Sequence, residues 1–402
     1  MTLDATVGEV APGSPVDAPL DLGGTHDAQV VTPDVASTPD AAMSMDAVVV
    51  PDGGTRIDAP VAADDVAMVD VPAPADVVAP LDRPVSRDVV DASSGADTPV
   101  LTDAPTPADI PMLPVPALST PRTSLGAAVG RDGRVYVIGG STVSTRYANL
   151  VESWRPGEST WTRRANLPIG ITSAGVATGG DGRIYAYGGE NGSGPSARTF
   201  AYDPAMDRWQ ELGEMARRRW GIASSDGSDG RVYAFSGNSG VGTVRDVEAF
   251  NPARNAWETL GSSSLYAVGA RAVNAGDGRV LLLGGYDNLS FFNTVYALQT
   301  TTGAWTVETR MPGARAWFGA ARALDGTVHV LGGNSLPSLP SAQHWVYNPQ
   351  SRTWSDAAPL PVALGSFATV CLLDGRILAI GGETRTDSRV ATVYAWSPDA
   401  WR

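Results

Sequence analysis

The sequence predicts an all-β domain built from six repeats, preceded by a long acidic segment that does not fold. Two observations carry this prediction. All 29 aromatic residues of the 402-residue chain lie at or after Tyr136. Over the same part of the chain, three short sequence markers recur at intervals of 48 or 49 residues. We therefore divide the chain into 1–117 and 118–402.

The segment 1–117 has the composition of a disordered spacer. It holds 17 of the 30 prolines and no aromatic residue, and its 20 acidic and three basic residues give it a charge of −17. Such a segment cannot bury enough apolar surface to offset the entropy of ordering. The net charge of −14 is the sum of −17 in this segment and +3 in 118–402, so the acidity of the chain lies in 1–117. All basic residues of 118–402 are arginine.

Aspartate has a period in this segment. It recurs every six residues from Asp34 to Asp88, slips by three to Asp91, and resumes the period up to Asp109. A polyproline II helix has three residues per turn, so these steps return to one face of an extended, self-repelling stalk. The prolines disfavour a hexapeptide β-helix, and the wide spacing disfavours calcium, which needs about six to eight oxygens. An acidic linker without a specific role is the competing interpretation.

Three markers define the repeat in the second part of the chain. An Asp-Gly pair precedes a short apolar run, a glycine pair ends that run, and a tryptophan closes the unit. The glycine-pair positions end at Gly140, Gly189, Gly237, Gly285, Gly333 and Gly382, with Ser236 as the first member of the third pair. The closing tryptophans are Trp161, Trp209, Trp257, Trp305, Trp354 and Trp401. Three markers in one register over six copies exclude chance.

Each unit predicts four short strands. In the first unit, 125–129 and 134–138 are joined by Asp-Gly, which suits a two-residue hairpin turn because glycine tolerates a positive φ. A variable loop follows the glycine pair, and the third and fourth strands lead to the tryptophan. Four antiparallel strands that recur about every 48 residues are typical of a propeller blade. The predicted blades are roughly 122–168, 171–216, 219–263, 267–312, 315–361 and 364–402.

The repeat resembles the Kelch family. The matching motifs are Asp-Gly-Arg-Val-Tyr-Val-Ile-Gly-Gly at 132–140 and Tyr-Asp-Pro followed by tryptophan at 202–209, with counterparts in the other units. The resemblance covers about 118–402 and implies a six-bladed Kelch-type β-propeller. Ser236 departs from the motif, as do His329 in the tyrosine position and 298–300 in place of Tyr-Asp-Pro.

The sixth unit lacks the residues that follow the tryptophan in the other units. By register, 112–118 precedes the first strand where this missing segment would lie. We therefore predict that 112–118 completes or covers the edge of blade six. Pro114 and Pro116 suit an edge strand, since proline cannot donate a hydrogen bond to a neighbouring strand.

The loops that enter the blades and those after the glycine pairs predict a ligand-binding face, because both open at the same end of a propeller. Arginine enters alternate blades, whereas Ile171, Ala267 and Leu364 enter the others. Arginine and aromatic side chains are enriched at interface hot spots, although the resemblance leaves a scaffold role open for these arginines. The candidate residues are Arg122, Arg219, Arg315, Trp220, Tyr266, Trp317, Phe291 and Phe292. The loops after the glycine pairs add Tyr147, Asn191, Asn238, Tyr286 and Asn334.

The sequence predicts no catalytic residue, metal ligand or cofactor. His329 and His344 are the only histidines outside the acidic segment, and two histidines on one blade do not make a zinc site. They also do not reproduce the ligand set of the copper oxidases that share this propeller type. Cys371 is expected to be a buried small hydrophobe, and a single cysteine excludes an intrachain disulfide.

Three functions remain open. The leading hypothesis is a non-catalytic module that binds a protein or a glycan and is carried on the acidic spacer. The alternatives are a carbohydrate-active enzyme, because some bacterial six-bladed Kelch proteins resemble sugar isomerases, and a structural repeat protein of the envelope. Nucleic acid is not an expected partner without a continuous basic stripe. We expect a monomer with no transmembrane segment, because no apolar run is long enough to span a bilayer.

Localisation depends on what precedes the chain. The first residues lack the basic and apolar regions of a signal peptide. The acidic spacer resembles those that follow the signal in bacterial surface lipoproteins. A secreted or cell-surface location is therefore expected if an upstream signal exists, and a cytoplasmic one otherwise.

Overall fold

The computed structural model describes residues 115–401, apart from 264, 266, 336–338 and 399. The chain divides into a unit over 1–95 and a unit over 96–402, and all statements below concern the described part of the second. The predicted acidic stalk therefore lies outside the described residues except for its last three. Within the described part there is no helix long and apolar enough to cross a membrane.

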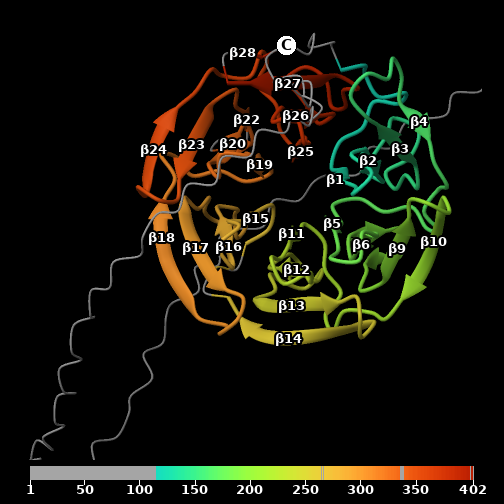
Figure 1. The fold of residues 1–402 in the computed structure, drawn as a ribbon, viewed down its shortest axis with the longest axis horizontal. Helices are drawn as coiled ribbons and strands as arrows, with labels where there is room; N and C mark the ends of the chain where they lie inside the picture. Colours follow the sequence, from blue (N-terminus) through green and yellow to red (C-terminus); the bar gives the residue numbers. More distant parts are fainter. Residues whose placement is uncertain (1–114, 264, 266, 336–338, 399, 402) are drawn as a thin grey trace, which may run out of the picture. The chain divides into compact units, whose positions relative to one another are not determined.

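The described residues form six four-stranded antiparallel sheets arranged around a central axis, as Figure 1 shows. This confirms the predicted six-bladed, all-β propeller. Blades one to three comprise β1 Gly126–Val129, β2 Val135–Ile138, β3 Val151–Trp154, β4 Thr162–Arg163, β5 Gly175–Thr178, β6 Ile184–Tyr187, β9 Thr199–Asp203, β10 Arg208–Leu212, β11 Ala223–Asp226, β12 Val232–Phe235, β13 Asp246–Asn251 and β14 Ala256–Ser262. Blades four to six comprise β15 Arg271–Asn274, β16 Arg279–Leu283, β17 Thr294–Gln299, β18 Trp305–Arg310, β19 Gly319–Arg322, β20 Val328–Leu331, β23 His344–Asn348, β24 Thr353–Asp356, β25 Ala368–Cys371, β26 Ile377–Ile380, β27 Val393–Ser397 and β28 Ala400–Trp401.

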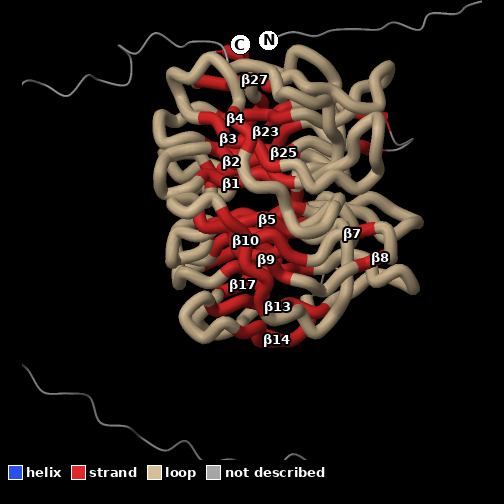
Figure 2. Tube along the Cα trace, turned by 90° about the vertical axis from the view of Figure 1, so that its right-hand side faces the viewer, coloured by secondary structure: helices blue, strands red, loops and turns tan. Residues whose placement is uncertain are grey.

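Two small hairpins interrupt this regular order. β7 Glu190–Asn191 pairs with β8 Gly194–Pro195 in blade two, and β21 Asn334–Ser335 pairs with β22 Leu339–Pro340 in blade five. Both follow a glycine pair, in the loop between the second and third strands. Figure 2 views the ring edge-on and shows β7 and β8 at one side of it. We call this side, where the loops after the glycine pairs lie, the loop face.

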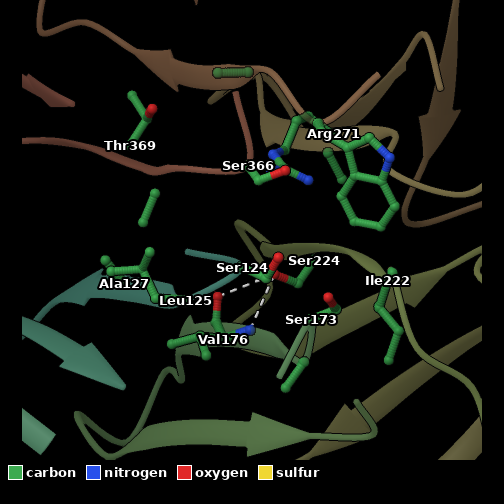
Figure 3. A pocket seen from close by; sticks show the side chains of 17 residues that line it. Ser124, Leu125, Ala127, Ser173, Val176, Ile222, Ser224, Arg271, Ser366 and Thr369 are labelled. Atoms are coloured by element: carbon green, nitrogen blue, oxygen red, sulfur yellow. Dashed lines mark hydrogen bonds between the residues drawn. The ribbon is translucent and has the colours of Figure 1, made fainter. Parts of the chain in front are cut away.

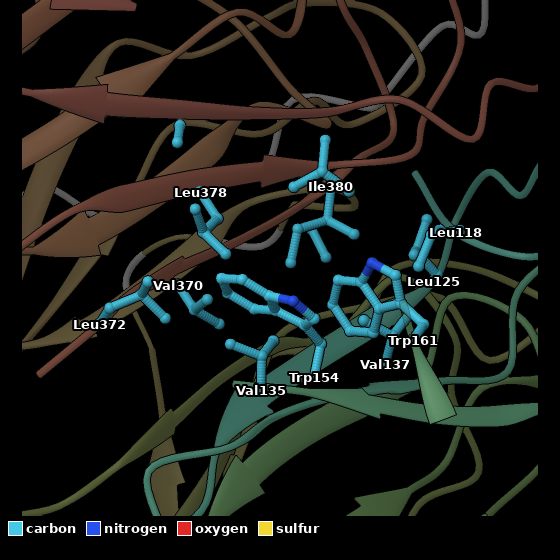
Figure 4. Packing of buried hydrophobic residues seen from close by; sticks show 13 residues of the cluster. Leu118, Leu125, Val135, Val137, Trp154, Trp161, Val370, Leu372, Leu378 and Ile380 are labelled. Carbon is cyan, nitrogen blue, oxygen red and sulfur yellow. The ribbon is translucent and has the colours of Figure 1, made fainter. Parts of the chain in front are cut away.

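The core lies between blades. Six clusters of buried apolar side chains join successive blades, and the second strand of each blade is buried along its length except for Arg279 at the start of β16. Figure 4 shows the cluster between blades six and one, in which Trp154 and Trp161 lie beside Leu378 and Ile380. Each blade buries both sheet faces against its neighbours, which explains the continuous apolar runs in the second strands.

The segment before the first strand joins the two ends of the ring. The Leu118 amide donates to the carbonyl of Ala391, which lies just before β27 of blade six, at 2.8 Å. The equivalent bond in blade one runs from the Leu167 amide to the Asn149 carbonyl. Trp161 Nε1 donates to the Pro116 carbonyl at 2.8 Å, which matches the bond from Trp209 to Ala165. Over residues 115–118 the predicted contact with blade six is therefore confirmed, while 112–114 lie outside the described residues.

Candidate ligand-binding face

A closed circle of backbone hydrogen bonds surrounds the axis at the loop face. One residue of each blade, just before the first strand, donates its amide to the carbonyl of the equivalent residue in the preceding blade, over 2.7–3.2 Å. All six residues have a positive φ between 53° and 66°. We call this circle the central ring; its members are Ser124, Ser173, Gly221, Gly269, Trp317 and Ser366.

Trp317 breaks the symmetry of the central ring. The other members are serine or glycine, whereas blade five places an indole at this position. A Cβ atom added at Gly269 would lie 2.6 Å from Trp317 Cδ2, and one at Gly221 would lie 3.0 Å from its Cη2. The two glycines therefore leave the space that the indole fills, and the indole extends across blades four and three at the end of the central channel.

Three further aromatic rings adjoin this indole. The Trp220 ring is nearly parallel to that of Trp317, with 6.0 Å between centroids and 9° between planes. Tyr286 lies 6.3 Å from Trp317 and stacks on Phe291 at 5.5 Å. All four side chains are partly exposed. We call them the aromatic patch; its members are Trp220, Tyr286, Phe291 and Trp317.

Hollows flank the indole of Trp317 on two sides. One, of about 320 Å³, is bounded by the loop of blade four and by Asn334. The other, of about 300 Å³, is lined by Trp220 and by Arg146, Glu190 and Arg389. Aromatic walls with a few convergent polar groups are typical of small-molecule sites.

The polar side of the patch is held by its own hydrogen bonds. Arg146 pairs with Glu190 at 2.9 Å, and Arg389 donates to Ser141 Oγ at 2.9 Å. Ser366 of the central ring donates to Glu383 Oε1 at 2.9 Å. Both signs of charge are therefore presented next to the aromatic rings.

The structure brings together three of the predicted site residues: Trp220, Trp317 and Phe291. Phe292 points the other way and packs on the buried cluster between blades three and four. Tyr266 lies outside the described residues. Tyr286, from the loops after the glycine pairs, completes the patch.

The three predicted arginines lie inside the blades. Arg122 and Arg219 are 0% exposed and Arg315 is 2% exposed. Arg122 pairs with Glu152 and donates to the carbonyls of Gly139 and Leu150 at 3.2 Å. Arg219 makes the same contacts in blade three, with Glu248 and the Ser236 carbonyl.

Arg315 differs because no carboxylate among the described residues faces it. It donates to the Gly332 carbonyl at 2.5 Å and to Gln343 Oε1 at 2.6 Å, and its guanidinium lies 3.6 Å from the centre of the Trp345 ring. Burial lowers its pKa to about 10, and burial also lowers the pKa of Arg122 to about 10, against the opposing effect of Glu152. With a pKa of about 10, the guanidinium groups of Arg315 and Arg122 are both positively charged at neutral pH.

These arginines therefore act as clamps between strands and are not available to a ligand in this conformation. For Arg122 and Arg219 the physical reason is the partner across the blade, because Glu152 and Glu248 are fully buried in the third strands. A carboxylate at such a position is the sequence signal that the arginine lies inside, since buried charges are paired.

The described residues offer no metal centre, because no group of three or more His, Cys, Asp or Glu side chains among them could hold an ion. His329 Nδ1 and His344 Nε2 lie 2.8 Å apart, both side chains buried. Cys371 was expected to be buried but is partly exposed. The partial burial of its thiol raises the pKa of Cys371 to about 11. A thiol with this pKa is a poor nucleophile at neutral pH.

Six four-stranded blades closed through a central ring define a six-bladed β-propeller. The chain contains Kelch motifs: the Kelch motif matches three of its six repeats, at residues 122–168, 173–216 and 268–312. Among solved structures, one titled "Structure of YjhT" is similar in fold, with a TM-score of 0.61 and 18% identity, over 71% of this chain and 98% of that one. No curated protein sequence matches the chain.

Proposed function

We propose that the protein is a non-catalytic binding module that recognises a glycan through the aromatic patch, with the acidic segment 1–117 as its spacer. The observation that carries the proposal is Trp317, which lies across the end of the channel where five blades have serine or glycine. A partly exposed indole stacked on a second indole is a flat apolar surface with a polar N–H at its edge.

The surroundings fit a sugar better than an apolar ligand. The C–H face of a sugar ring packs on an aromatic plane, while its hydroxyl groups need donors and acceptors around the rim. Asn334 lines the hollow on one side of the indole, and Arg146 and Glu190 line the hollow on the other. Each hollow has the size of a small-ligand site, at about 300–1,000 Å³ for such sites in general.

A glycan array probed with the full chain tests the proposal, followed by calorimetry on the best ligand. The decisive variant is Trp317→Ser, because serine occupies this ring position in blades one, two and six with φ of 53°. The fold therefore accommodates serine here. We expect binding to weaken by about tenfold or more, which corresponds to about 1.4 kcal/mol or more, as for an aromatic hot spot.

The matched control is Val241→Ser, at a loop tip of the same face where the side chain is 98% exposed and outside the patch. It should bind like the wild-type chain. If Trp317→Ser binds glycans as well as the wild type, the patch is not the site. If the wild-type chain binds no glycan but captures a protein through Trp317, the ligand class is wrong.

A further inference from the structure

A single charged side chain lines the central cavity. This cavity of about 110 Å³ lies between the first strands of the blades, and Figure 3 shows Arg271 in its wall with Ser224 and Thr369. The residues equivalent to Arg271 in the other blades are Gly126, Gly175, Ala223, Gly319 and Ala368. Blade four therefore places a guanidinium where every other blade has no side chain beyond a methyl group.

The charge of Arg271 is not balanced by the protein. Among the described residues it has no ion pair, and its one hydrogen bond is from Nη1 to the Ala270 carbonyl at 3.1 Å. No acidic side chain of the described part of the chain lines the cavity. Arginine has five N–H donors, so most of them face the cavity without a protein acceptor. Burial alone lowers the pKa of Arg271, to about 10.

This arginine contrasts with the three buried arginines of blades one, three and five. Arg122 and Arg219 meet a carboxylate, and Arg315 meets an amide oxygen and an indole face. The fold supplies partners for those three buried arginines, whereas Arg271 is partly exposed to the cavity and leaves most of its donors free for an acceptor from outside. A second unpartnered polar atom lines the same cavity: Thr369 Oγ1 is buried without a hydrogen bond.

The cavity has an entrance away from the aromatic patch. It shares Ala127, Ser224 and Thr369 with a wider hollow of about 610 Å³ that runs toward the Asp-Gly turns. Among the described residues, the charged groups of this hollow are Arg131, Arg322 and Asp226. Two cations against one carboxylate favour the approach of an anion.

We propose that the central cavity binds a small oxyanion, a carboxylate or a tetrahedral anion such as phosphate, through Arg271. The planar guanidinium donates two parallel N–H bonds to two oxygens of such a group. The cavity holds far more than one water, for which about 10–15 Å³ is enough. Its own volume of about 110 Å³ suits the anionic group, and the rest of a larger ligand would extend into the wider hollow. Trp317 also lines this cavity, on the side of the aromatic patch, while the wider hollow opens from it toward the opposite end.

Calorimetry and thermal unfolding of the full chain test the site, with inorganic phosphate, sulfate and acetate each compared with chloride at equal ionic strength. The test variant is Arg271→Ala, since alanine occupies the equivalent position in blades three and six. The matched control is Arg254→Ala, an exposed arginine in the turn between β13 and β14 that lines neither the cavity nor the wider hollow. We expect a saturable rise of the wild-type unfolding temperature with at least one oxyanion.

The Arg271→Ala variant should lose this response, with affinity weaker by about tenfold or more, while Arg254→Ala should respond like the wild type. In chloride alone, Arg271→Ala should be about as stable as the wild type, because the variant loses no ion pair and only the hydrogen bond from Nη1 to the Ala270 carbonyl. A response to acetate only narrows the ligand to carboxylates, and one to phosphate and sulfate narrows it to tetrahedral anions. No saturable response in the wild type, or an undiminished response in Arg271→Ala, overturns the proposal.

Discussion

Blades one, three and five begin with an arginine where blades two, four and six begin with Ile171, Ala267 or Leu364. The facing position in the third strand changes with it. Opposite the arginines lie Glu152, Glu248 and Trp345, and opposite the apolar residues lie Phe200, Tyr296 and Tyr394.

This difference shows that the same backbone contact between blades is compatible with either a polar or an apolar pair of side chains. The entering residue and the facing residue of the third strand must then change together. In every blade the backbone carbonyl of the entering residue accepts from the glycine pair of the preceding blade. In odd blades the side chain also reaches the carbonyl of its own glycine-pair position. A buried ion pair and an apolar contact of similar volume contribute similar stability, but half of an ion pair does not.

The largest loss of stability is expected when the arginine of one odd-numbered blade is removed while its buried carboxylate stays. Arg219→Leu leaves the Glu248 carboxylate buried, with only the Ala216 amide as a donor at 2.6 Å. The free energy of unfolding, measured by urea titration of tryptophan fluorescence, should fall by about 3–5 kcal/mol.

The matched control converts blade three to the pattern of blade six. Arg219→Leu combined with Glu248→Tyr reproduces the pairing of Leu364 with Tyr394, and should recover most of the lost stability. A double variant as unstable as Arg219→Leu alone would show that the two patterns are not interchangeable.

Blade five departs from the other odd blades a second time, through its buried histidines. The Ala358 carbonyl can only accept, so the neutral His344 carries its proton on Nδ1 and accepts at Nε2 from His329. Burial lowers the pKa of both imidazoles from 6.5 to about 4, and nearby Asp325 opposes this only weakly at His329. A proton added at His344 Nε2 would meet the proton on His329 Nδ1, so His329 would have to carry its proton on Nε2 instead.

The pH dependence of stability follows from these values. Between pH 6.5 and 4 the unfolded chain binds more protons than the folded one, so stability is complete above pH 6.5 and is lost as pH falls. At pH 5.5 the loss should be about 1.4 kcal/mol per imidazole relative to pH 7.5. His329→Leu, which reproduces Leu281 and Leu378, should halve that loss in urea titrations, and an unchanged loss would contradict the assignment.

A smaller effect is expected at Arg315, the odd-blade arginine without a carboxylate. Arg315→Leu reproduces the residue of blade six and leaves only an amide oxygen and a carbonyl without a donor. The expected cost in urea unfolding is about 1–2 kcal/mol. If this variant is as unstable as Arg219→Leu, the carboxylate is not what makes the odd blades sensitive.

The sequence predicted the ring but not the interior position of its arginines. Asp-Gly turns, glycine pairs and tryptophans act locally, so their spacing was enough to predict six blades. The same reasoning placed Trp220, Trp317 and Phe291 at one face, because loop position follows from register. An arginine at a blade entrance looks the same in sequence whether it faces solvent or the blade interior. A glutamate in the facing third strand is a signal for Arg122 and Arg219, whereas Arg315 lies inside with an amide and an indole as partners.

Arg271 escaped sequence analysis for a different reason. The first strand is predicted from its small apolar residues, and one arginine among them resembles an ordinary exposed position. Its meaning depends on the closure of six strands around an axis, which brings five alanines or glycines to the same level. Such a comparison between repeats requires the register that only the folded ring makes certain.

The smallest effect is expected at an ion pair outside the blades' interior. Arg198, just before β9, and Glu211, on β10 of blade two, lie 2.6 Å apart, with 33% and 46% of their side chains exposed. Water already solvates both charges, so a double-mutant cycle with Arg198→Ala and Glu211→Ala should give a coupling of only about 0.2–1 kcal/mol, reduced further in 1 M salt. A coupling as large as that of Arg219 with Glu248 would mean that geometry, and not burial, governs the arginine pairs of this propeller.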